Sequence, residues 1–487
     1  MSDDATAGTS VVVVGGGAAG LVVARDLAAR GARVHVLEAT ASLGGCVAAH
    51  EVGGLLLDAG AESFSTRSPA VRQLVDELGL GDGVVVPASS GAWVRLADRA
   101  VPLPATGVLG IPGDPWATDV LRAVGTLGAA RAALDRWLPP RVGLPAGETS
   151  LADVVRTRMG RRVLDRLVGP VVAGVYSTSA SASDLDTVLP GVRALIHETG
   201  SLGAAVTRLR AAAPAGASVA SLDGGMHRLV GALRRDLEAR GVPISMGTAV
   251  EGVARAAGGG WSVRTVGGGR VAADRVVLAV PGPVAVRLLD DVVPEIQVLA
   301  GPTADVVLVT LVVDAPALDP APRGSGVLVA AGVPGMHAKA LTHATAKWAW
   351  LARAAGTGRH VLRLSYGRSG DAVGGGASSG EALGVRGPRA DVRDLPPDRL
   401  TELARRDAAA LLGVPIPPGA VVDAAVTRWA GVLPLVRPGH HERVEAVRTA
   451  LAGHDGLTVC GSWLAGTGLA AVVGHARSTA AGVRVGP

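Results

Sequence analysis

The most apolar stretch of the chain begins near its N-terminus and is interrupted by glycines. Residues 11–14 are a run of valines, and β-branched residues without polar alternation predict a strand that is buried on both faces. Residues 19–30 carry apolar side chains at helical spacing and stop before Gly31, which predicts a helix. Residues 33–39, with the sequence RVHVLEA, predict a second strand. Together these segments predict a βαβ unit.

Three kinds of segment would look this apolar: a secretory signal, a membrane anchor and a nucleotide-binding βαβ unit. The flank MSDDATAGTS is acidic, whereas a signal peptide has a cationic flank. The apolar run ends at Arg25 after about 15 residues, and a membrane-spanning helix needs about 20. The shorter runs ADVVLVTLVVD and DRVVLAVPGPVAV predict buried strands. We therefore expect no transmembrane helix and favour the nucleotide-binding unit.

The turn between the first strand and the helix carries the candidate chemistry. Residues 15–20 read GGGAAG and fit the pattern G-x-G-x-x-G. In that pattern Gly15 permits the tight turn, Gly17 lets the backbone approach a pyrophosphate, and Gly20 lets the helix pack against the sheet. Glu38 closes the second strand, where a carboxylate can accept hydrogen bonds from ribose hydroxyls. We predict a dinucleotide site; the alternative is a βαβ unit whose glycines serve packing alone.

Later parts of the chain repeat or change this pattern. Residues 457–469 again predict a strand, a glycine turn at Gly466-Thr467-Gly468 and a helix that begins near Leu469. Residues 221–253 predict a glycine turn, a helix and a strand that ends near Val250. Between residues 112 and 210 the pattern becomes helical, and Ser150 with Asp153 predicts a capped helix start.

Composition excludes several classes of function. Among 487 residues there are 47 Lys plus Arg and 42 Asp plus Glu, with 2% aromatic residues and no concentrated basic run, so we expect no nucleic-acid binding. Two cysteines cannot form a disulfide framework, and a reducing cytoplasm is the simplest compartment. The spacing of the histidines predicts no metal site. Residues 376–380 match G-x-S-x-G but follow no buried strand, so a hydrolase is not favoured.

The glycine-rich segments resemble the FAD-binding superfamily of amine oxidases, phytoene desaturases and protoporphyrinogen oxidases. The resemblance rests on Glu38 with LGGCV, on GGLLLDAGAESF at residues 53–64, and on the C-terminal block. The porphyrinogen oxidase branch matches best, through residues 103–116, 163–185 and 433–444 and the sequence AKW around Lys347. The composition points to a GC-rich genome, and the family's members in GC-rich Gram-positive bacteria resemble coproporphyrinogen III oxidases.

This resemblance implies an α/β fold with a discontinuous Rossmann-like FAD-binding domain, an antiparallel-sheet substrate domain and a helical insertion domain. The FAD-binding domain would comprise residues 10–95, 213–300 and 425–487. The substrate domain would comprise residues 96–111 and 301–424. The helical insertion would comprise residues 112–212.

The resemblance also implies a set of residues that contact FAD. They are Gly15, Gly16, Gly17, Ala18, Ala19, Gly20, Glu38, Ala39, Gly44, Gly45, Cys46, Gly60, Ala61, Glu62, Ser63, Val250, Trp429, Gly461, Thr467, Gly468 and Leu469. Ser42 and Cys46 stand where the family has arginines, so we expect backbone contacts at Gly44 and Gly45. A lone thiol at Cys46 is better explained by packing than by redox chemistry.

The implied reaction is the six-electron oxidation of coproporphyrinogen III to coproporphyrin III in haem biosynthesis, with O2 as acceptor and H2O2 as by-product. FAD carries the chemistry, and no side chain is expected to act as a catalytic base. Arg67, Tyr176, Lys347 and Arg437 are candidates to bind the substrate propionates. The alternatives are a protoporphyrinogen IX oxidase and, further away, a flavin amine oxidase or carotenoid desaturase. We expect a cytoplasmic protein and leave open a peripheral membrane contact and a transient contact with the next enzyme of the pathway.

Overall fold

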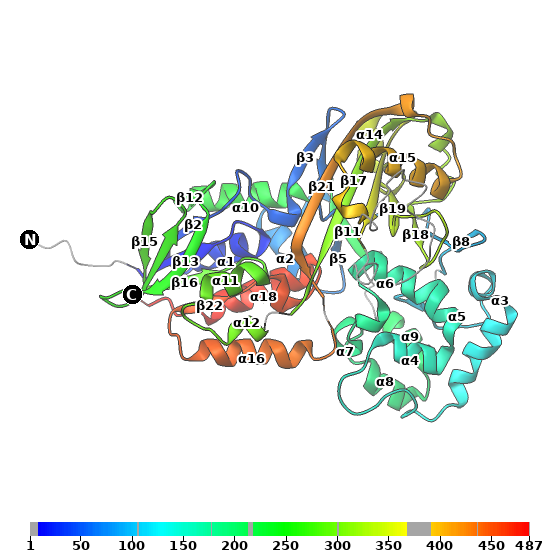
Figure 1. The fold of residues 1–487 in the computed structure, drawn as a ribbon, viewed down its shortest axis with the longest axis horizontal. Helices are drawn as coiled ribbons and strands as arrows, with labels where there is room; N and C mark the ends of the chain where they lie inside the picture. The colour runs from blue at the N-terminus through cyan, green and yellow to red at the C-terminus, as the bar shows by residue number, and fades with distance from the viewer. Residues whose placement is uncertain are drawn as a thin grey trace, which may run out of the picture.

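The computed structural model describes residues 8–104, 107–176, 178–212, 218–299, 301–367, 391–435 and 437–486. The G-x-S-x-G segment at residues 376–380 lies outside this part of the chain. Within the described ranges, no helix is both long and apolar enough to cross a bilayer. The fold is a mixed α/β arrangement of several sheets and helices (Figure 1).

A five-stranded parallel sheet forms the left part of the molecule in Figure 1. In the order β12-β2-β1-β16-β22, its strands are Ile244–Ser245, Arg33–Leu37, Ser10–Val14, Arg275–Leu278 and Leu457–Val459. They come from three distant parts of the chain. The predicted first strand and helix are confirmed as β1 and α1 (Ala18–Ala29).

Both faces of this sheet are covered, which explains the unbroken apolar run in β1. The Val11 and Val13 side chains lie on one face and pack in a core with α1, α10 (His227–Ala239) and α18 (Leu469–Gly482). Val12 and Val14 pack against the other face, with α11 (Gly282–Leu289) and α16 (His440–Ala452). A three-stranded antiparallel sheet also covers that face; it contains β13 (Val250–Arg255), β14 (Trp261–Thr265) and β15 (Arg270–Ala273).

One expected boundary differs in the structure. Val250 does not end a strand but begins β13. The strand that pairs with β2 after α10 is the short β12, Ile244–Ser245. Beyond β12 the chain stays beside the end of β2, where Thr248 donates its amide to the Glu38 carbonyl at 2.7 Å. Gly247, with φ of 65°, lies in the turn that leads to β13.

A seven-stranded sheet forms the upper right part of Figure 1. In the order β21-β17-β20-β19-β18-β7-β8, its strands are Val421–Pro434, Thr303–Asp314, Arg359–Tyr366, Ala340–His343, Gly326–Val329, Trp93–Arg95 and Ala100–Pro102. All neighbours are antiparallel except β18 and β7, which pair in parallel. β7 and residues 425–434 of β21 belong to this sheet because β18 and β17 supply their hydrogen-bonding partners.

Short strands and helices connect the two large sheets. The short strands are β3 (Ala49–Val52), β4 (Leu55–Asp58), β5 (Phe64–Ser65), β6 (Val84–Val85) and β11 (Val219–Leu222). The helices between and beside the sheets are α2 (Ala70–Glu77), α12 (Ile296–Leu299), α13 (Ala344–Lys347), α14 (Ala349–Ala355), α15 (Pro397–Leu412) and α17 (Ser462–Ala465).

A group of helices fills the lower right part of Figure 1. It contains α3 (Thr118–Ala133), α4 (Leu151–Met159), α5 (Arg161–Val163), α6 (Gly169–Tyr176), α7 (Leu185–Val188), α8 (Val192–Thr199) and α9 (Leu202–Ala211). The predicted helix start is confirmed, because the Ser150 hydroxyl accepts the Asp153 amide at 3.1 Å. Within the helical pattern expected between residues 112 and 210, α3 is interrupted at Gly125, whose φ of 71° lies outside the helical range.

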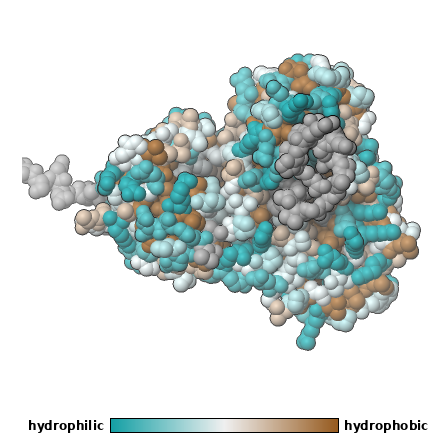
Figure 2. Space-filling model, viewed as in Figure 1, coloured by the Kyte–Doolittle hydropathy of each residue, from teal (hydrophilic) through white to brown (hydrophobic). Residues whose placement is uncertain are grey.

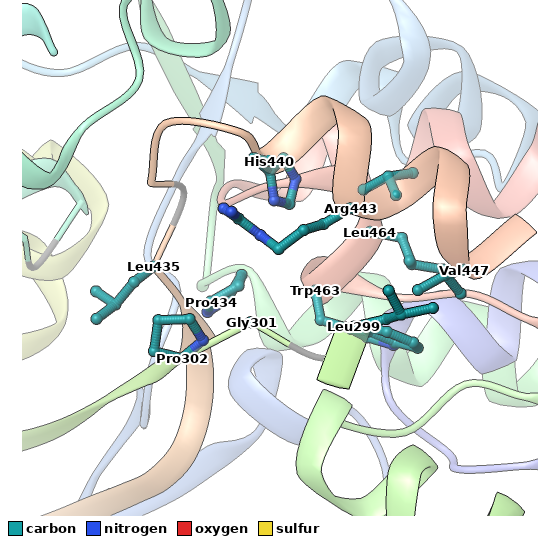
Figure 3. A pocket seen from close by; sticks show the side chains of 11 residues that line it. Leu299, Gly301, Pro302, Pro434, Leu435, His440, Arg443, Val447, Trp463 and Leu464 are labelled. Atoms are coloured by element: carbon teal, nitrogen blue, oxygen red, sulfur yellow. The ribbon is translucent and has the colours of Figure 1, made fainter. Parts of the chain in front are cut away.

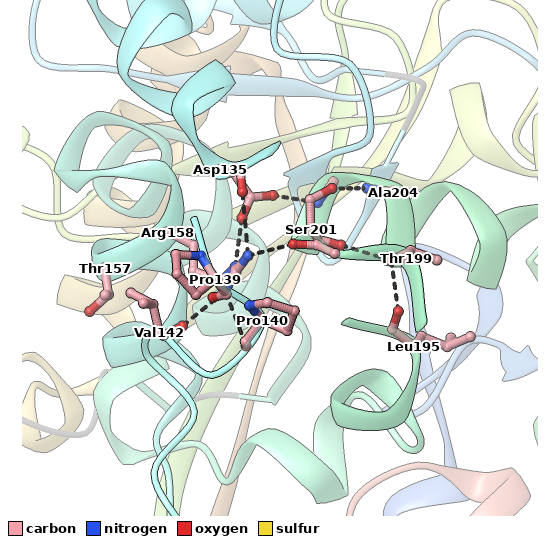
Figure 4. A network of polar contacts seen from close by, with 12 residues as sticks. Asp135, Pro139, Pro140, Val142, Thr157, Arg158, Leu195, Thr199, Ser201 and Ala204 are labelled. Atoms are coloured by element: carbon pink, nitrogen blue, oxygen red, sulfur yellow. Dashed lines mark hydrogen bonds and ion pairs between the residues drawn. The ribbon is translucent and has the colours of Figure 1, made fainter. Parts of the chain in front are cut away.

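The centre of the helical group contains a buried charge pair (Figure 4). The Arg158 guanidinium lies 2.5 Å from an Asp135 carboxylate oxygen, and both side chains are almost fully buried. Arg158 also donates to the carbonyls of Val142 at 2.9 Å and Gly200 at 3.0 Å, and Asp135 accepts the Gly203 amide at 2.9 Å. These bonds compensate the buried charges and tie α4, the loop before it and the start of α9 together.

Candidate functional site

The three glycines of the first turn meet different surroundings. A Cβ atom at Gly15 would lie 2.5 Å from the Ala279 carbonyl oxygen, and one at Gly20 would lie 1.9 Å from the Gly15 carbonyl oxygen. The chain itself therefore requires these two glycines. A Cβ at Gly17 would meet nothing within 4 Å, although Gly17 stands directly before α1. The open space at this helix N-terminus suits a pyrophosphate.

The Glu38 carboxylate lies beside the same turn. One of its oxygens accepts the Gly16 amide at 2.7 Å, and the other accepts the amide and hydroxyl of Thr40 at 2.8 and 2.7 Å. These bonds fix the carboxylate at the carboxyl end of β2, just before Ala39. The oxygen that accepts the Gly16 amide keeps a lone pair for a further donor, so Glu38 suits a ribose hydroxyl of a dinucleotide. Val250 is buried close by, at the start of β13.

The second glycine pair extends the cradle away from Glu38. The Gly44 amide donates to the Gly16 carbonyl at 2.8 Å, and Gly44 pairs with Gly17 as an isolated bridge. A Cβ at Gly45 would lie 3.5 Å from the Gly17 Cα. The backbones of Gly16, Gly17, Gly44 and Gly45 therefore lie close together at this point.

The next segment, residues 59–63, is attached through Cys46. The Cys46 carbonyl accepts the Ala61 amide at 2.7 Å, and a Cβ at Gly60 would lie 2.2 Å from that carbonyl oxygen. Ser63 is partly buried beside these residues. Burial raises the pKa of the Cys46 thiol to about 11, so the thiol is protonated at neutral pH and a poor nucleophile. This geometry favours the packing explanation for Cys46.

The C-terminal glycines reach the same edge of the sheet from another strand. Because β1, β2, β16 and β22 are parallel, the turns that follow them all lie at their carboxyl ends. Gly461, with φ of 125°, follows β22, and Thr467 and Gly468 precede α18, which begins at Leu469. A Cβ at Gly466 or Gly468 would meet nothing within 4 Å. Two helix N-termini, those of α1 and α18, therefore border open space at one sheet edge.

Trp429 comes to this region on β21, which contacts α17 and α11. The indole is partly buried, and its N–H has no hydrogen-bond partner among the described residues. A buried donor without a partner is costly, so it suits a ligand acceptor at this place. The open glycines, the Glu38 carboxylate and this donor fit FAD, which an extended crevice across the carboxyl ends of parallel strands accommodates.

The four candidate propionate ligands lie in different surroundings. Arg67 and Arg437 are exposed, and Tyr176 ends α6, with its side chain outside the described atoms. Lys347 is not free: its ammonium forms an ion pair with Glu62. The structure thus brings Lys347 together with Glu62, which we expected to contact the cofactor. Among the described side chains, it does not bring Lys347 together with the other propionate candidates.

Sequence reasoning missed Arg363, which joins the same place from β20. Its guanidinium donates to the Gly60 carbonyl, and to the Asp58 carbonyl at 3.4 Å. The signal was present in VLRLSY at residues 361–366, where one arginine interrupts a strand of mostly apolar residues. A charge at a half-buried strand position is unusual and needs a partner.

Two pockets lie beside this site. The first is lined by Leu57, Asp58, Glu62, Thr310, Ala344, Trp348, Trp350, Leu351, Val361 and Arg363. The second is lined by Leu299, Gly301, Pro302, Pro434, Leu435, His440, Arg443, Val444, Val447, Trp463 and Leu464. In Figure 3 the His440 and Arg443 side chains from α16 lie above an apolar floor that includes Trp463 and Leu464. Each pocket combines apolar walls with one guanidinium, that of Arg363 in the first and that of Arg443 in the second.

The fold and the cradle together define an FAD-dependent oxidoreductase. The chain matches the family described as flavin containing amine oxidoreductase over residues 18–484. It is 32% identical to a Mycobacterium tuberculosis protein named coproporphyrinogen III oxidase, over 96% of this chain and 95% of that protein. The chain therefore belongs to the flavin containing amine oxidoreductase family, and its cofactor is FAD.

Solved structures agree with this assignment. An Exiguobacterium structure named as a candidate protoporphyrinogen oxidase has a TM-score of 0.81 and 25% identity, covering 99% of this chain and 98% of that one. A variant of putrescine oxidase has a TM-score of 0.65 and 18% identity, covering 98% of both chains. The second likeness shows a common fold alone.

Proposed function

We propose that this protein oxidises coproporphyrinogen III to coproporphyrin III, with O2 as the electron acceptor and H2O2 as the by-product, in haem biosynthesis. The observation that carries the proposal is the 32% identity, over nearly the whole chain, to a protein named coproporphyrinogen III oxidase. The FAD cradle at the carboxyl ends of the parallel strands supplies the redox centre that this reaction needs.

The reaction removes six electrons in three rounds. In each round two electrons and two protons leave the macrocycle and one O2 becomes one H2O2. The whole reaction therefore consumes three O2 and forms three H2O2. Bound FAD supplies the chemistry of taking a hydride from a carbon bridge and passing the electrons to O2. No side chain has to act as a strong base, since a pyrrole N–H can release its proton to water.

The chain's own residues bind and orient. We assign Gly17, Gly44 and Gly45 to the pyrophosphate and Glu38 to the ribose. The N-terminus of α18, which begins at Leu469, favours negative charge on a reduced cofactor. Residues 10–95, 213–300 and 425–487 would form most of this binding unit, with residues 96–111 and 301–424 over it and residues 112–212 as a helical insertion.

We assign propionate binding mainly to exposed cationic side chains. Arg67 and Arg437 are exposed and unpaired with acids in the described part of the chain, so both can form bidentate contacts with carboxylates. Tyr176 is the third candidate. Lys347 would contribute a propionate contact only after separating from Glu62.

The deciding experiment compares two porphyrinogens. We expect the appearance of porphyrin fluorescence to be faster with coproporphyrinogen III than with protoporphyrinogen IX at matched concentrations. A tenfold higher kcat/KM for protoporphyrinogen IX, about 1.4 kcal/mol of transition-state preference, would replace the proposal by its first alternative. Oxygen uptake with a polyamine or consumption of a carotenoid, and none with either porphyrinogen, would favour the amine oxidase or desaturase alternative.

We propose that the protein works in the cytoplasm and makes a peripheral contact with a membrane or a transient contact with the next enzyme of the pathway. Leu127 on α3 is 73% exposed and Trp137 beyond it is 64% exposed, with the Arg136 guanidinium 3.9 Å from the Trp137 ring. Hydrophobic and hydrophilic residues are interspersed over the face shown in Figure 2. Exposed apolar residues next to an arginine suit either an anionic lipid surface or the next enzyme of the pathway. Co-sedimentation with anionic vesicles, compared with Trp137→Ser, tests the lipid contact.

A further inference from the structure

Three charged side chains from different elements meet beside residues 59–63. Glu62 follows β4, Lys347 ends α13, and Arg363 lies on β20. The Lys347 ammonium pairs with one oxygen of Glu62, and the Arg363 guanidinium lies 3.9 Å from the other. The three side chains are only 16–19% exposed. We call Glu62, Lys347 and Arg363 the Glu62 cluster.

The Glu62 cluster contains two positively charged side chains and one negatively charged side chain. Burial by itself would raise the pKa of Glu62, but the charges of Lys347 and Arg363 and the Lys347 hydrogen bond outweigh it, and the net pKa lies below its usual value. Glu62 is therefore ionised at neutral pH, and its single negative charge faces two cations. The nearby Asp58 carboxylate is directed elsewhere: it accepts the amides of Met226 and His227, at 3.0 and 2.9 Å, at the start of α10.

The Glu62 cluster is attached to the cofactor cradle through backbone contacts. Gly17 pairs with Gly44, the Cys46 carbonyl accepts the Ala61 amide, and Arg363 donates to the Gly60 carbonyl. The ribose side of the cradle lies at Glu38, which accepts the Gly16 amide, and the contacts from Gly17 through Gly44 and Cys46 lead to residues 59–63. A dinucleotide extended through the open space at Gly17 therefore places its flavin end towards residues 59–63.

We propose that the Glu62 cluster is a positioning and charge-setting device for the flavin, in which Arg363 fixes the Gly60 carbonyl and the balance between Lys347 and Glu62 sets the reduction potential. Reduction adds two electrons to the flavin, together with protons from water, so positive charge nearby favours the reduced form. The low exposure of the cluster limits screening by salt. This inference rests on FAD binding and not on the identity of the substrate.

The test uses charge changes of opposite sign in the FAD-loaded protein. Midpoint potentials are measured by reductive titration against a reference dye, for the wild type, Lys347→Met, Glu62→Gln and the double variant. We expect Lys347→Met to shift the potential to more negative values and Glu62→Gln to more positive values. The double variant has the same net charge as the wild type and should return close to its potential. Lys347→Arg keeps the charge and serves as the matched control.

A purely structural role would give a different pattern. Both single variants would then shift the potential in the same direction or leave it unchanged, and either result overturns the proposal. Should the double variant lose FAD while circular dichroism shows it folded, the cluster would be assigned to cofactor retention and the proposal would also fail. The potentials do not depend on substrate, so a wrong choice of porphyrinogen leaves this test intact.

Discussion

The Gly20 Cα faces the Gly15 carbonyl so closely that a Cβ at Gly20 would lie 1.9 Å from that oxygen, whereas a Cβ at Gly17, in the same turn, would meet nothing within 4 Å. We expect Gly17→Ala to leave the free energy of unfolding of the FAD-free protein nearly unchanged, since Gly17 has an extended backbone that alanine adopts. Its methyl group would occupy the ligand's space, and we expect FAD affinity to fall at least about tenfold, or about 1.4 kcal/mol. Isothermal titration of the apoprotein with FAD measures this.

The matched variant is Gly20→Ala. Its methyl group clashes with the protein's own backbone. We therefore expect the free energy of unfolding, measured with urea, to fall by about 1–3 kcal/mol even without FAD. Equal FAD affinities for the wild type and Gly17→Ala would show that the ligand does not approach this glycine.

The cradle was predictable from sequence because its parts are local. The strand, glycine turn and helix at residues 11–30 specify one another through periodicity and turn chemistry, and the same holds before Leu469. The Glu62–Lys347 pair was not predictable, because its partners are 285 positions apart and meet only through the packing of β4 against the seven-stranded sheet. The strand end near Val250 was misplaced because a two-residue strand leaves almost no periodic signal.

The buried Arg158–Asp135 pair predicts a stability effect remote from the cofactor. We expect Arg158→Met to lower the free energy of unfolding by about 3–5 kcal/mol, because Asp135 would remain buried without a compensating charge. Arg156→Met is the control, since Arg156 lies on the same helix but pairs with Asp153 at the exposed surface. Urea unfolding, followed by circular dichroism, measures the stability of both variants. Comparable urea midpoints for Arg158→Met and Arg156→Met would mean that the buried pair contributes little to stability.

The histidine network at the start of β20 predicts a pH dependence of stability. His343 is fully buried, its ring lies 3.0 Å from that of His360, and His360 lies 3.1 Å from Asp319. Burial and the charge of His360 lower the pKa of His343 from 6.5 to about 4. The unfolded chain therefore binds a proton more readily, and the folded state loses stability as the pH falls from about 6.5 towards 4.

At about pH 5 this loss amounts to about 2 kcal/mol, and His343→Gln should remove most of it. Urea midpoints at about pH 7.5 and 5 give the comparison, with the exposed His441→Gln as the surface control. A variant that loses as much stability on acidification as the wild type would assign the effect to other groups.

The exposed arginines Arg67 and Arg437 give the last prediction, which concerns the substrate. A propionate lies far from the carbon that loses hydride, so its contact with a guanidinium is the same before and during the reaction. Removing that contact weakens binding of substrate and transition state equally. We therefore expect Arg67→Ala and Arg437→Ala to raise KM by about threefold to thirtyfold while kcat stays within about twofold. Steady-state kinetics with coproporphyrinogen III check this, and a fall in kcat at unchanged KM would place these arginines elsewhere. Because coproporphyrinogen III carries four propionates and protoporphyrinogen IX two, the loss in kcat/KM should be larger for coproporphyrinogen III.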